Sequence, residues 1–279
     1  MKIAYLSLRE KMRFRNYCFL IFIFVIASCS SNKYAASNKD YRRQAKALAK
    51  QIRKVPVDQY YDPSTWAGTV NFGLRKPNFV IIHHTAQNSC EQTLKTFTLR
   101  RTQVSAHYVI CKDGTVHHML NDYFRAWHAG ISSWGNDKDI NSSSIGIELD
   151  NNGFDSFPPV QLVSLLTLLD TLQSKYAIPA ANFIGHGDIA PLRKNDPNVN
   201  FPWRLLAQYG YGLWYGDTSN IIVPGDFNSL RALRIIGYSV KDSAAAIVAF
   251  KRHFESVDSS AILTESDKKI LYDLMGKYE

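Results

Sequence analysis

The chain lacks a hydrophobic run long enough to cross a bilayer. Its longest apolar stretch, residues 17–27, has 11 residues, whereas a spanning helix needs about 20. Basic residues precede this stretch at Arg9, Lys11, Arg13 and Arg15. A short apolar segment behind a basic one is typical of a secretory signal peptide. We therefore expect residues 1–28 to be an export signal, which begins at Met1 or at Met12.

Cysteine is also scarce, with four in 279 residues. Cys18 lies within the expected signal, and Cys29 ends the segment Ile-Ala-Ser-Cys, which resembles a bacterial lipobox. On that interpretation the chain is cut before Cys29 and its thiol is acylated; the alternative is ordinary secretion with a chance cysteine at the cut. Only Cys90 and Cys111 then remain in an oxidising compartment. Whether they pair stays open, because a sequence does not supply the geometry.

An acylated Cys29 would anchor the chain, because each buried CH₂ adds about 0.8 kcal/mol of membrane affinity and two chains anchor stably. The next residue is Ser30. By resemblance to Gram-negative lipoproteins, serine at this position implies the outer membrane, since aspartate is the usual retention signal. We expect an outer-membrane lipoprotein on the periplasmic side, held by lipid and monomeric.

Acidic residues are few near the start of the mature chain. The formal charge is +9, of which residues 1–28 contribute five basic and one acidic side chain, or +4, which leaves +5. Between residues 30 and 58, eight Lys or Arg stand against two Asp. Residues 42–54 could form a basic helix. We interpret residues 29–59 as a lipidated basic tether, solvated or loosely attracted to anionic lipid or wall polymer; an exported chain argues against nucleic acid.

The remaining chain has no internal repeat and divides at the polar residues 215–220. Residues 60–215 mix strand and helix patterns. Strands are predicted at 79–82, at 106–112 and 115–120 around an Asp-Gly hairpin turn, at 144–149 and at 182–184; helices are predicted at 91–101 and 160–176. The fold class is therefore α/β, with a mixed central sheet flanked by helices. Residues 221–279 read as three short helices, a small all-α domain.

Two histidines close the first buried strand. His83 and His84 are consecutive, so in a strand they point to opposite faces and cannot easily ligate one ion together. The alternation does not say which one faces a site. His186 follows a later short strand, and the loop after it holds Asp188 and Asp196, which both qualify as carboxylate ligands. Two imidazoles and one carboxylate would suit a hydrolytic zinc centre with an open position.

Glu148 is the candidate acid or base. It lies in the apolar strand 144–149 on the face opposite Ile145 and Ile147, next to Gly146. A buried glutamate is costly without a partner, and burial moves its pKa toward the working range of a general base. The alternative is an edge-strand glutamate in water. Lys194 could hold a developing oxyanion, although taken alone it is an exposed lysine.

Five segments together resemble the zinc-dependent N-acetylmuramoyl-L-alanine amidases, the family that shares its fold with peptidoglycan recognition proteins. The matching segments are 82–86 (IHHTA), 105–108 (SAHY), 126–130 (AWHAG), 144–148 (SIGIE) and 185–197 (GHGDIAPLRKNDP). They keep the order and spacing of the family and span about residues 78–214. Each segment is weak alone, whereas all five together are specific. They look like those of the outer-membrane lipoprotein amidases of Gram-negative bacteria, which add a small helical tail.

The resemblance implies a role for each matching residue. The zinc ligands would be His83, His186 and Asp196; Glu148 would be the catalytic acid and base, and Lys194 its cationic helper. Trp127 and His128 match a segment that lines the substrate groove, and His107 matches one near the metal, where a packed histidine is an equal alternative. His117, His118 and His253 match nothing, so we predict no function for them.

The implied reaction is hydrolysis of the amide between N-acetylmuramic acid, including its 1,6-anhydro form, and L-alanine, by a zinc-activated water. Two alternatives stay open: a module that only binds peptidoglycan, and a zinc endopeptidase that cuts within the stem peptide. The tail is similar to the three-helix peptidoglycan-binding domain, with the turn Ile236-Gly237-Tyr238 and a helix that ends at Phe254. A structural bundle packed on the body is the alternative for the tail.

Overall fold

The computed structural model describes residues 33–54, 67–256 and 260–279. The expected signal peptide and Cys29 lie outside these residues. The chain divides into two compact units, residues 1–70 and 71–279. In the first unit the structure describes one helix, α2 (Ala35–Ile52), which extends the predicted basic helix toward the N-terminus. None of the helices in the described part of the chain combines the length and apolarity that a membrane span requires.

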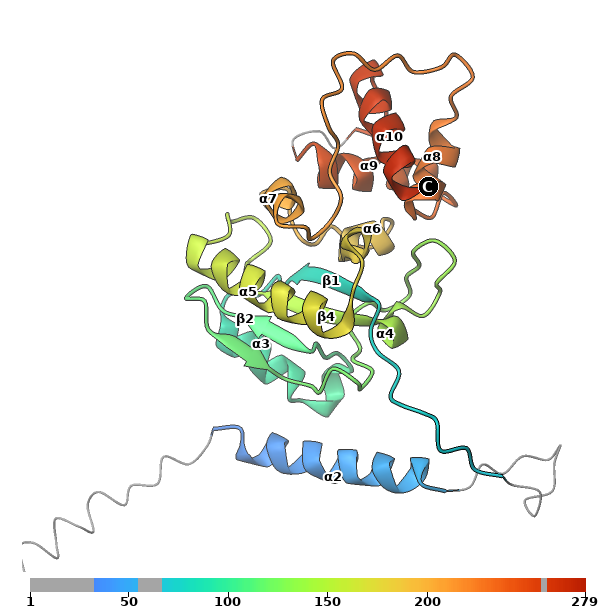
Figure 1. Ribbon diagram of the computed structural model, residues 1–279. Coiled ribbons are helices and arrows are strands. Elements are labelled where there is room, and N and C mark those ends of the chain that lie inside the picture. Colours follow the sequence, from blue (N-terminus) through green and yellow to red (C-terminus); the bar gives the residue numbers. More distant parts are fainter. Residues whose placement is uncertain (1–32, 55–66, 257–259) are drawn as a thin grey trace, which may run out of the picture. The chain divides into compact units, whose positions relative to one another are not determined.

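The second unit is built on a five-stranded sheet with the order β3-β2-β4-β1-β5 (Figure 1). The strands are β1 (Phe79–His84), β2 (Tyr108–Ile110), β3 (Val116–His118), β4 (Ser144–Leu149) and β5 (Phe183–Gly185). β4, β1 and β5 are parallel neighbours, β2 is parallel to β4, and β3 is an antiparallel edge. The predicted mixed sheet and the hairpin are confirmed.

Helices lie between these strands and after β5. They are α3 (Cys90–Phe97), η2 (Arg100–Thr102), α4 (Ile140–Ser143), α5 (Pro159–Tyr176), η3 (Ala180–Asn182), α6 (His186–Ile189) and α7 (Trp203–Gln208). α5 has Pro159 in its first turn, where a missing N–H costs nothing. Its leucine stripe packs with Val80, Ile82 and Ile147 into one hydrophobic core. One face of the sheet is therefore closed by α5.

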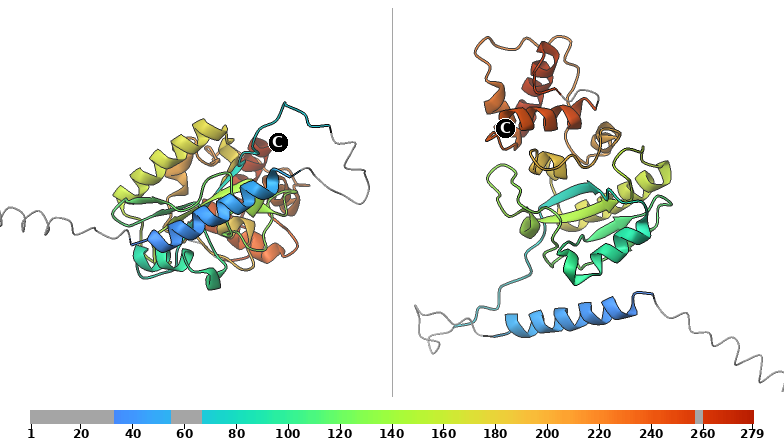
Figure 2. Two further views of the ribbon diagram at one scale, coloured as in Figure 1. Left: turned by 90° about the horizontal axis from the view of Figure 1, so that it is seen from below. Right: turned by 180° about the vertical axis from the view of Figure 1, so that it is seen from behind.

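The opposite face of the sheet packs against the C-terminal helices α8 (Ser229–Ile236), α9 (Ser243–Phe254) and α10 (Glu265–Tyr278). A side-chain oxygen of the preceding residue caps each helix: Asn228, Asp242 and Thr264. Ile81 and Ile184 of the sheet share a second hydrophobic core with Phe250 and other residues of these helices. Figures 1 and 2 show the C-terminal helices beside α6 and α7. The three-helix tail is thus confirmed, and it packs closely on the body.

Candidate metal centre and active site

Three buried side chains converge at the carboxyl ends of β1 and β5. The Nδ1 atoms of His83 and His186 are 3.0 Å apart, and each lies 3.0 Å from Oδ2 of Asp196. The three residues are no more than 6% exposed. They form one of two groups in the described residues whose ligand atoms are close enough to hold a metal ion. Ligand atoms bonded at about 2.0–2.1 Å to a tetrahedral zinc lie roughly 3.3 Å apart, so the spacing suits that ion.

The register of the sheet brings these residues together. His83 of β1 pairs with Glu148 of β4, and Ile82 of β1 pairs with Gly185 of β5, so His83, Glu148 and His186 leave the same face of the sheet. The alternation of β1 turns the side chain of His84 to the other face of the strand, although His84 also contributes to the wall of the pocket over the site. The loop after α6 then returns Asp196, and its carbonyl accepts a 2.7 Å hydrogen bond from the N–H of Gly187. Of the two consecutive histidines and the two loop aspartates, it is His83 and Asp196 that converge with His186.

The contacts of Nε2 in His83 and in His186 determine which ring nitrogen of each histidine carries the proton. Nε2 of His186 is 3.1 Å from the carbonyl of Ala129, which can only accept. Nε2 of His83 is 3.0 Å from Nδ1 of His128, whose own Nε2 is 3.2 Å from Oγ of Ser144. That hydroxyl donates to the carbonyl of Ile140, so it accepts from His128, and His128 accepts from His83. Both Nδ1 atoms therefore present lone pairs to Asp196.

The electrostatics of the cluster match neutral imidazole ligands. Burial, aided by the charge of His186, lowers the pKa of His83 to about 4. Burial acts to raise the pKa of Asp196, but its contacts with His186 and His83 hold that pKa well below the usual range. Two lone-pair nitrogens and a carboxylate packed at hydrogen-bond distance repel one another unless a cation lies between them. The residues present therefore fit a divalent metal ion.

Glu148 faces the same space. Its Oε2 is buried and has no hydrogen-bond partner among the described residues. Burial raises the pKa of Glu148 well above its usual value, the charge of Asp196 adds to this, and Lys194 opposes it. An unpartnered buried carboxylate is costly to keep, and carboxylates with raised pKa values are candidates for proton transfer. This carboxylate is available to a substrate or a water molecule.

A pocket of about 310 Å³ opens over these groups. His83, His186, Asp196 and Glu148 contribute to its lining. Other parts of its wall come from α3, from the loop before β2, from the segment between β3 and α4, and from the loop between α6 and Asp196; they include Thr93, Thr96, Phe97, Val104, Ser105, Trp127, His128, Arg193, Lys194 and Asn195. The side chain of Trp127 is 48% exposed, so an apolar ring is open to solvent in this wall. The pocket therefore places this exposed ring and two cationic side chains, Arg193 and Lys194, around the carboxylate of Glu148.

Comparison with known proteins gives the family. A family model described as N-acetylmuramoyl-L-alanine amidase matches residues 73–199. The N-acetylmuramoyl-L-alanine amidase AmiD of Escherichia coli is 32% identical over 231 residues, which are 71% of this chain and 82% of AmiD. The chain belongs to the N-acetylmuramoyl-L-alanine amidase family. The 1,6-anhydro-N-acetylmuramyl-L-alanine amidase AmpD of the same organism is 39% identical over 101 residues, about half of its length.

Two solved structures are similar to this amidase over most of its chain. The complex of AmiD from E. coli with anhydro-N-acetylmuramic acid-L-Ala-D-γ-Glu-L-Lys superposes with a TM-score of 0.66 at 28% identity, and it covers 80% of this chain and 97% of AmiD. AmpDh3 of Pseudomonas aeruginosa gives a TM-score of 0.68 at 26% identity, with 81% and 99% covered. Because both alignments take in nearly the whole of the other chain, the amidase shares its architecture with these enzymes.

The structure places most of the predicted site residues of the amidase around the pocket. Lys194, Trp127 and His128 contribute to its lining. His107 does not: its Nδ1 accepts from the N–H of Gly146 and its Nε2 donates to the carbonyl of Phe124. The ring of His128 lies directly over Gly146, where a Cβ would overlap it.

The contact between His128 and His83 could not be predicted from the sequence. The pattern gave no signal for it, because Nε2 of His83 and Nδ1 of His128 meet only in the folded chain, 45 residues apart in sequence.

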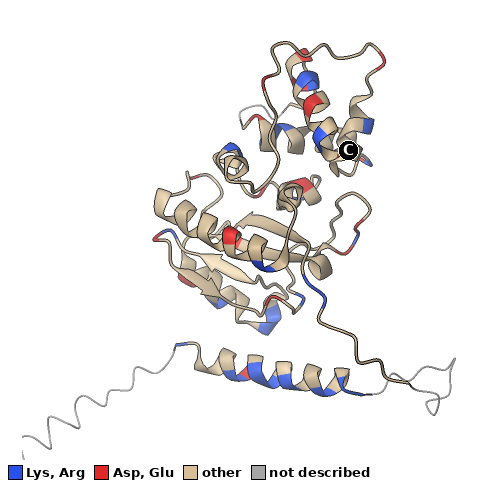
Figure 3. Cartoon of the chain, viewed as in Figure 1, with Lys and Arg blue, Asp and Glu red and all other residues tan. Residues whose placement is uncertain are grey.

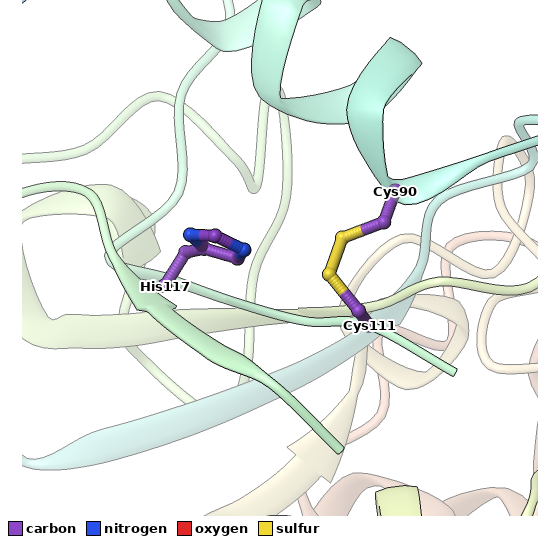
Figure 4. A group of neighbouring side chains, drawn as sticks. All are labelled: Cys90, Cys111 and His117. Atoms are coloured by element: carbon purple, nitrogen blue, oxygen red, sulfur yellow. A yellow bond between two sulfur atoms is a disulfide. The ribbon is translucent and has the colours of Figure 1, made fainter. Parts of the chain in front are cut away.

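The second potential ligand group is Cys90, Cys111 and His117 (Figure 4). Cys90 at the start of α3 and Cys111 after β2 form a disulfide, with their Cα atoms 5.3 Å apart. The pairing that the sequence left open is therefore present. A cysteine binds a metal ion as a thiolate, and a sulfur atom in a disulfide is not a thiolate. The Cys90–Cys111 disulfide instead links the start of α3 to the end of β2.

Proposed function

We propose that this amidase hydrolyses the amide between N-acetylmuramic acid and L-alanine with one zinc ion held by His83, His186 and Asp196. The observation that carries the metal assignment is the convergence of two Nδ1 lone pairs and one carboxylate oxygen at 3.0 Å. Zinc in such a site acts as a Lewis acid, which lowers the pKa of a bound water and polarises a carbonyl. Muropeptides, including the 1,6-anhydro form, are the proposed substrates, by similarity to AmiD and AmpD.

Glu148 is the proposed proton carrier. Its unpartnered Oε2 lies in the pocket lining on the same face of the sheet as His83. It takes a proton from the water that attacks the lactyl-amide carbonyl, and it returns a proton to the nitrogen of the leaving L-alanine. Burial makes the ionised carboxylate a stronger base. No covalent intermediate on the protein is needed.

Lys194 and Trp127 have the supporting roles. Lys194 is half-buried in the pocket wall, where its ammonium stabilises negative charge on the amide oxygen as the bond breaks. Trp127 offers an exposed aromatic face to the substrate. His128 does not need to touch substrate in this assignment, because its two ring nitrogens are already used by His83 and Ser144.

Product analysis tests the reaction. Purified sacculi and 1,6-anhydro-muropeptides are digested with and without a chelator, and the products are identified by mass spectrometry. Free stem peptides that begin with L-alanine are expected, together with their loss on chelation and recovery with zinc. Cuts inside the stem peptide would identify an endopeptidase instead. Binding without any product would identify a recognition module.

We also propose that the amidase is an outer-membrane lipoprotein acylated at Cys29, with α2 lying on an anionic membrane surface. Basic residues recur along α2 at three- and four-residue spacing, which places them on one exposed face of the helix: Lys39, Arg42, Arg43, Lys46 and Lys50 (Figure 3). Asp40, the one acidic residue of α2, pairs with Arg43. Leu48 and Ile52 lie on the opposite face and are exposed. Cationic and apolar faces on one helix are typical of membrane-surface binding.

The tail is proposed to bind peptidoglycan. The support is its similarity to three-helix wall-binding domains and the exposed Leu230 on α8, which does not pack into the core. Pelleting with sacculi tests it: Leu230→Glu should reduce the bound fraction while muropeptide hydrolysis in solution is unchanged. Equal pelleting of the variant and the wild type would leave the tail without a wall-binding role at this surface.

A further inference from the structure

The carboxylate of Asp188 links the metal site to the tail. Asp188 lies in α6, two residues after the proposed ligand His186, and it is 4% exposed. The other proposed ligand of this segment, Asp196, follows in the loop after α6. Its Oδ2 accepts hydrogen bonds from the N–H of Gly185 and from Nδ1 of His253, both at 2.8 Å. Its Oδ1 accepts from the hydroxyl of Tyr238 at 2.8 Å. Two of these three donors belong to the C-terminal tail: Tyr238 lies in the turn after α8, and His253 lies in α9.

We propose that Tyr238 and His253 are positioning residues of the active site, which act through Asp188 to hold the metal ligand His186 in place. The C-terminal helices then have a second role besides any binding to the wall: they complete the support of the metal centre. This inference rests on the assignment of His83, His186 and Asp196 as metal ligands.

α6 needs support from outside. It has four residues, and isolated helices of that length do not form, because a single turn costs more conformational entropy than its hydrogen bonds return. Asp188 holds the first turn of α6 through the N–H of Gly185. Ile189 adds an apolar contact in the core shared with Phe250 of α9. The position of α6, and with it that of His186, therefore depends in part on groups that the tail supplies.

The two tail donors are themselves held by the body. The ring of His253 stacks on Trp203 of α7, with centroids 4.0 Å apart and an interplanar angle of 13°. The ring of Tyr238 meets Trp134 edge to face at 4.9 Å. Gly237, with φ of 135°, lies so close to the Trp134 ring that a Cβ would overlap it. These contacts fix both donors, so Asp188 has one position in which both of its oxygens are satisfied.

The loss of Tyr238 or His253 as a hydrogen-bond donor would disturb the position of His186. A buried carboxylate without its partners is strongly destabilised, and it would turn toward water. Asp188 would then release the N–H of Gly185, the residue that precedes His186. Metal sites lose roughly 10- to 100-fold in affinity when such supporting contacts are removed. We expect a loss in that range for zinc.

Tyr238, in the turn after α8, and His253 are both buried in their contacts with Asp188. Tyr238 is 2% exposed and His253 is 5% exposed. They face the body of the amidase, so they are not available to a wall polymer. Substitutions at these two positions therefore separate the two roles of the tail, because they leave its outer surface unchanged.

The test measures zinc affinity of the full chain by competition with a chromogenic chelator, for Tyr238→Phe and His253→Leu. Both remove a donor with little change in volume. His253→Asn is the rescue variant, since its amide N–H₂ can replace the Nδ1 donor. Lys251→Met is the matched control: Lys251 lies on the same helix, is fully buried and pairs with Asp267 at 2.8 Å, so its loss destabilises the tail without touching Asp188.

The expected result is a 10- to 100-fold weaker zinc affinity for Tyr238→Phe and His253→Leu, with substantial recovery in His253→Asn and a wild-type affinity for Lys251→Met. At limiting zinc the first two should lose kcat with KM unchanged, and excess zinc should restore kcat. Wild-type affinity in both variants, or equal losses in the Lys251→Met control, would overturn the inference. If the wild type itself takes up no zinc, the metal assignment fails instead.

Discussion

His83 of β1 and Glu148 of β4 are partners in the register of two parallel strands, so their side chains leave the same face of the sheet. A proposed metal ligand and a proposed proton carrier are thereby set by backbone hydrogen bonds and not by flexible loops. Functional groups on strands are held more precisely than groups on loops. The remaining ligand that depends on a loop is Asp196, whose backbone carbonyl is tied to the N–H of Gly187.

The role of Glu148 leads to the first prediction. Glu148→Gln keeps the size and polarity of the side chain but cannot take a proton, so we expect kcat to fall by about 10²–10⁴-fold. Zinc content, measured by atomic absorption, should equal that of the wild type, because Glu148 is not a ligand. Normal turnover by this variant would remove Glu148 from the mechanism. In the wild type, the raised pKa of Glu148 places the acidic limb of kcat/KM above pH 4.5, with activity falling as pH drops.

The second prediction concerns the chain of hydrogen bonds from His83 through His128 to Ser144. His128→Leu removes the acceptor for Nε2 of His83, so we expect zinc affinity to fall about 10- to 100-fold. His128→Gln, which keeps an acceptor and a donor, should recover part of the loss. Chelator competition measures both. His107→Leu is a useful comparison, because His107 is buried on the same side without touching a ligand. Equal zinc affinities in His128→Leu and the wild type would contradict the proposed support.

The third prediction tests stability near Asp122, away from the site. Burial acts to raise the pKa of Asp122, but contacts with His118, Tyr176 and Tyr108 outweigh it and lower the pKa far below its usual value. An acid with a lowered folded pKa stabilises the protein above about pH 4, and this contribution is lost as pH falls. Asp122→Asn should therefore cost about 1–3 kcal/mol at pH 7. Its stability should also change less between pH 4 and pH 2, as followed by urea denaturation.

The fourth prediction tests the basic face of α2. In a Cys29→Ser background, which removes the proposed acylation site, the protein should pellet with vesicles rich in phosphatidylglycerol and not with neutral ones. Each lysine near an anionic surface contributes about 1 kcal/mol, so the triple change Lys39→Glu, Lys46→Glu and Lys50→Glu should weaken binding by at least about 100-fold.

A charge-matched control uses lysines that are exposed on the second unit: Lys76→Glu, Lys138→Glu and Lys241→Glu. It should bind nearly as the wild type does, and added salt should weaken the wild type. Equal losses in both triple variants would mean that net charge alone governs binding. Binding to sacculi without binding to vesicles would place the basic face on the wall.

Much of the fold could be predicted because its elements have clear local patterns. The leucine stripe of α5 and the Asp-Gly turn between β2 and β3 are signals within a few residues of sequence. The strand order was not predictable, since β4 enters between β1 and β2, which precede it in the chain. The single-turn helices α4 and α6 were missed for a related reason: packing against other segments stabilises them, and their own sequences do not.

The candidate site, like the fold, could be predicted from the sequence only in part. The alternation of a strand places His83 and His84 on opposite faces, but only the pairing with β4 and β5 decides between them. Asp188 and Asp196 are equivalent by residue type, and they separate only when the loop folds and Asp188 turns to Tyr238. His253, for which the sequence predicted no function, is 65 residues from the carboxylate that it contacts. Contacts at such separations leave no local pattern.

The Cys90–Cys111 bond decides how the enzyme should be produced. It joins the first residue of α3 to Cys111, which follows β2. The same helix carries Thr93, Thr96 and Phe97 of the pocket wall. Closing a loop of this size stabilises a protein by about 3 kcal/mol. A preparation from a reducing cytoplasm would keep His83, His186 and Asp196 together but leave one side of the substrate cleft untethered. Recombinant material should therefore be matured in the periplasm before its kinetics are compared with those of relatives.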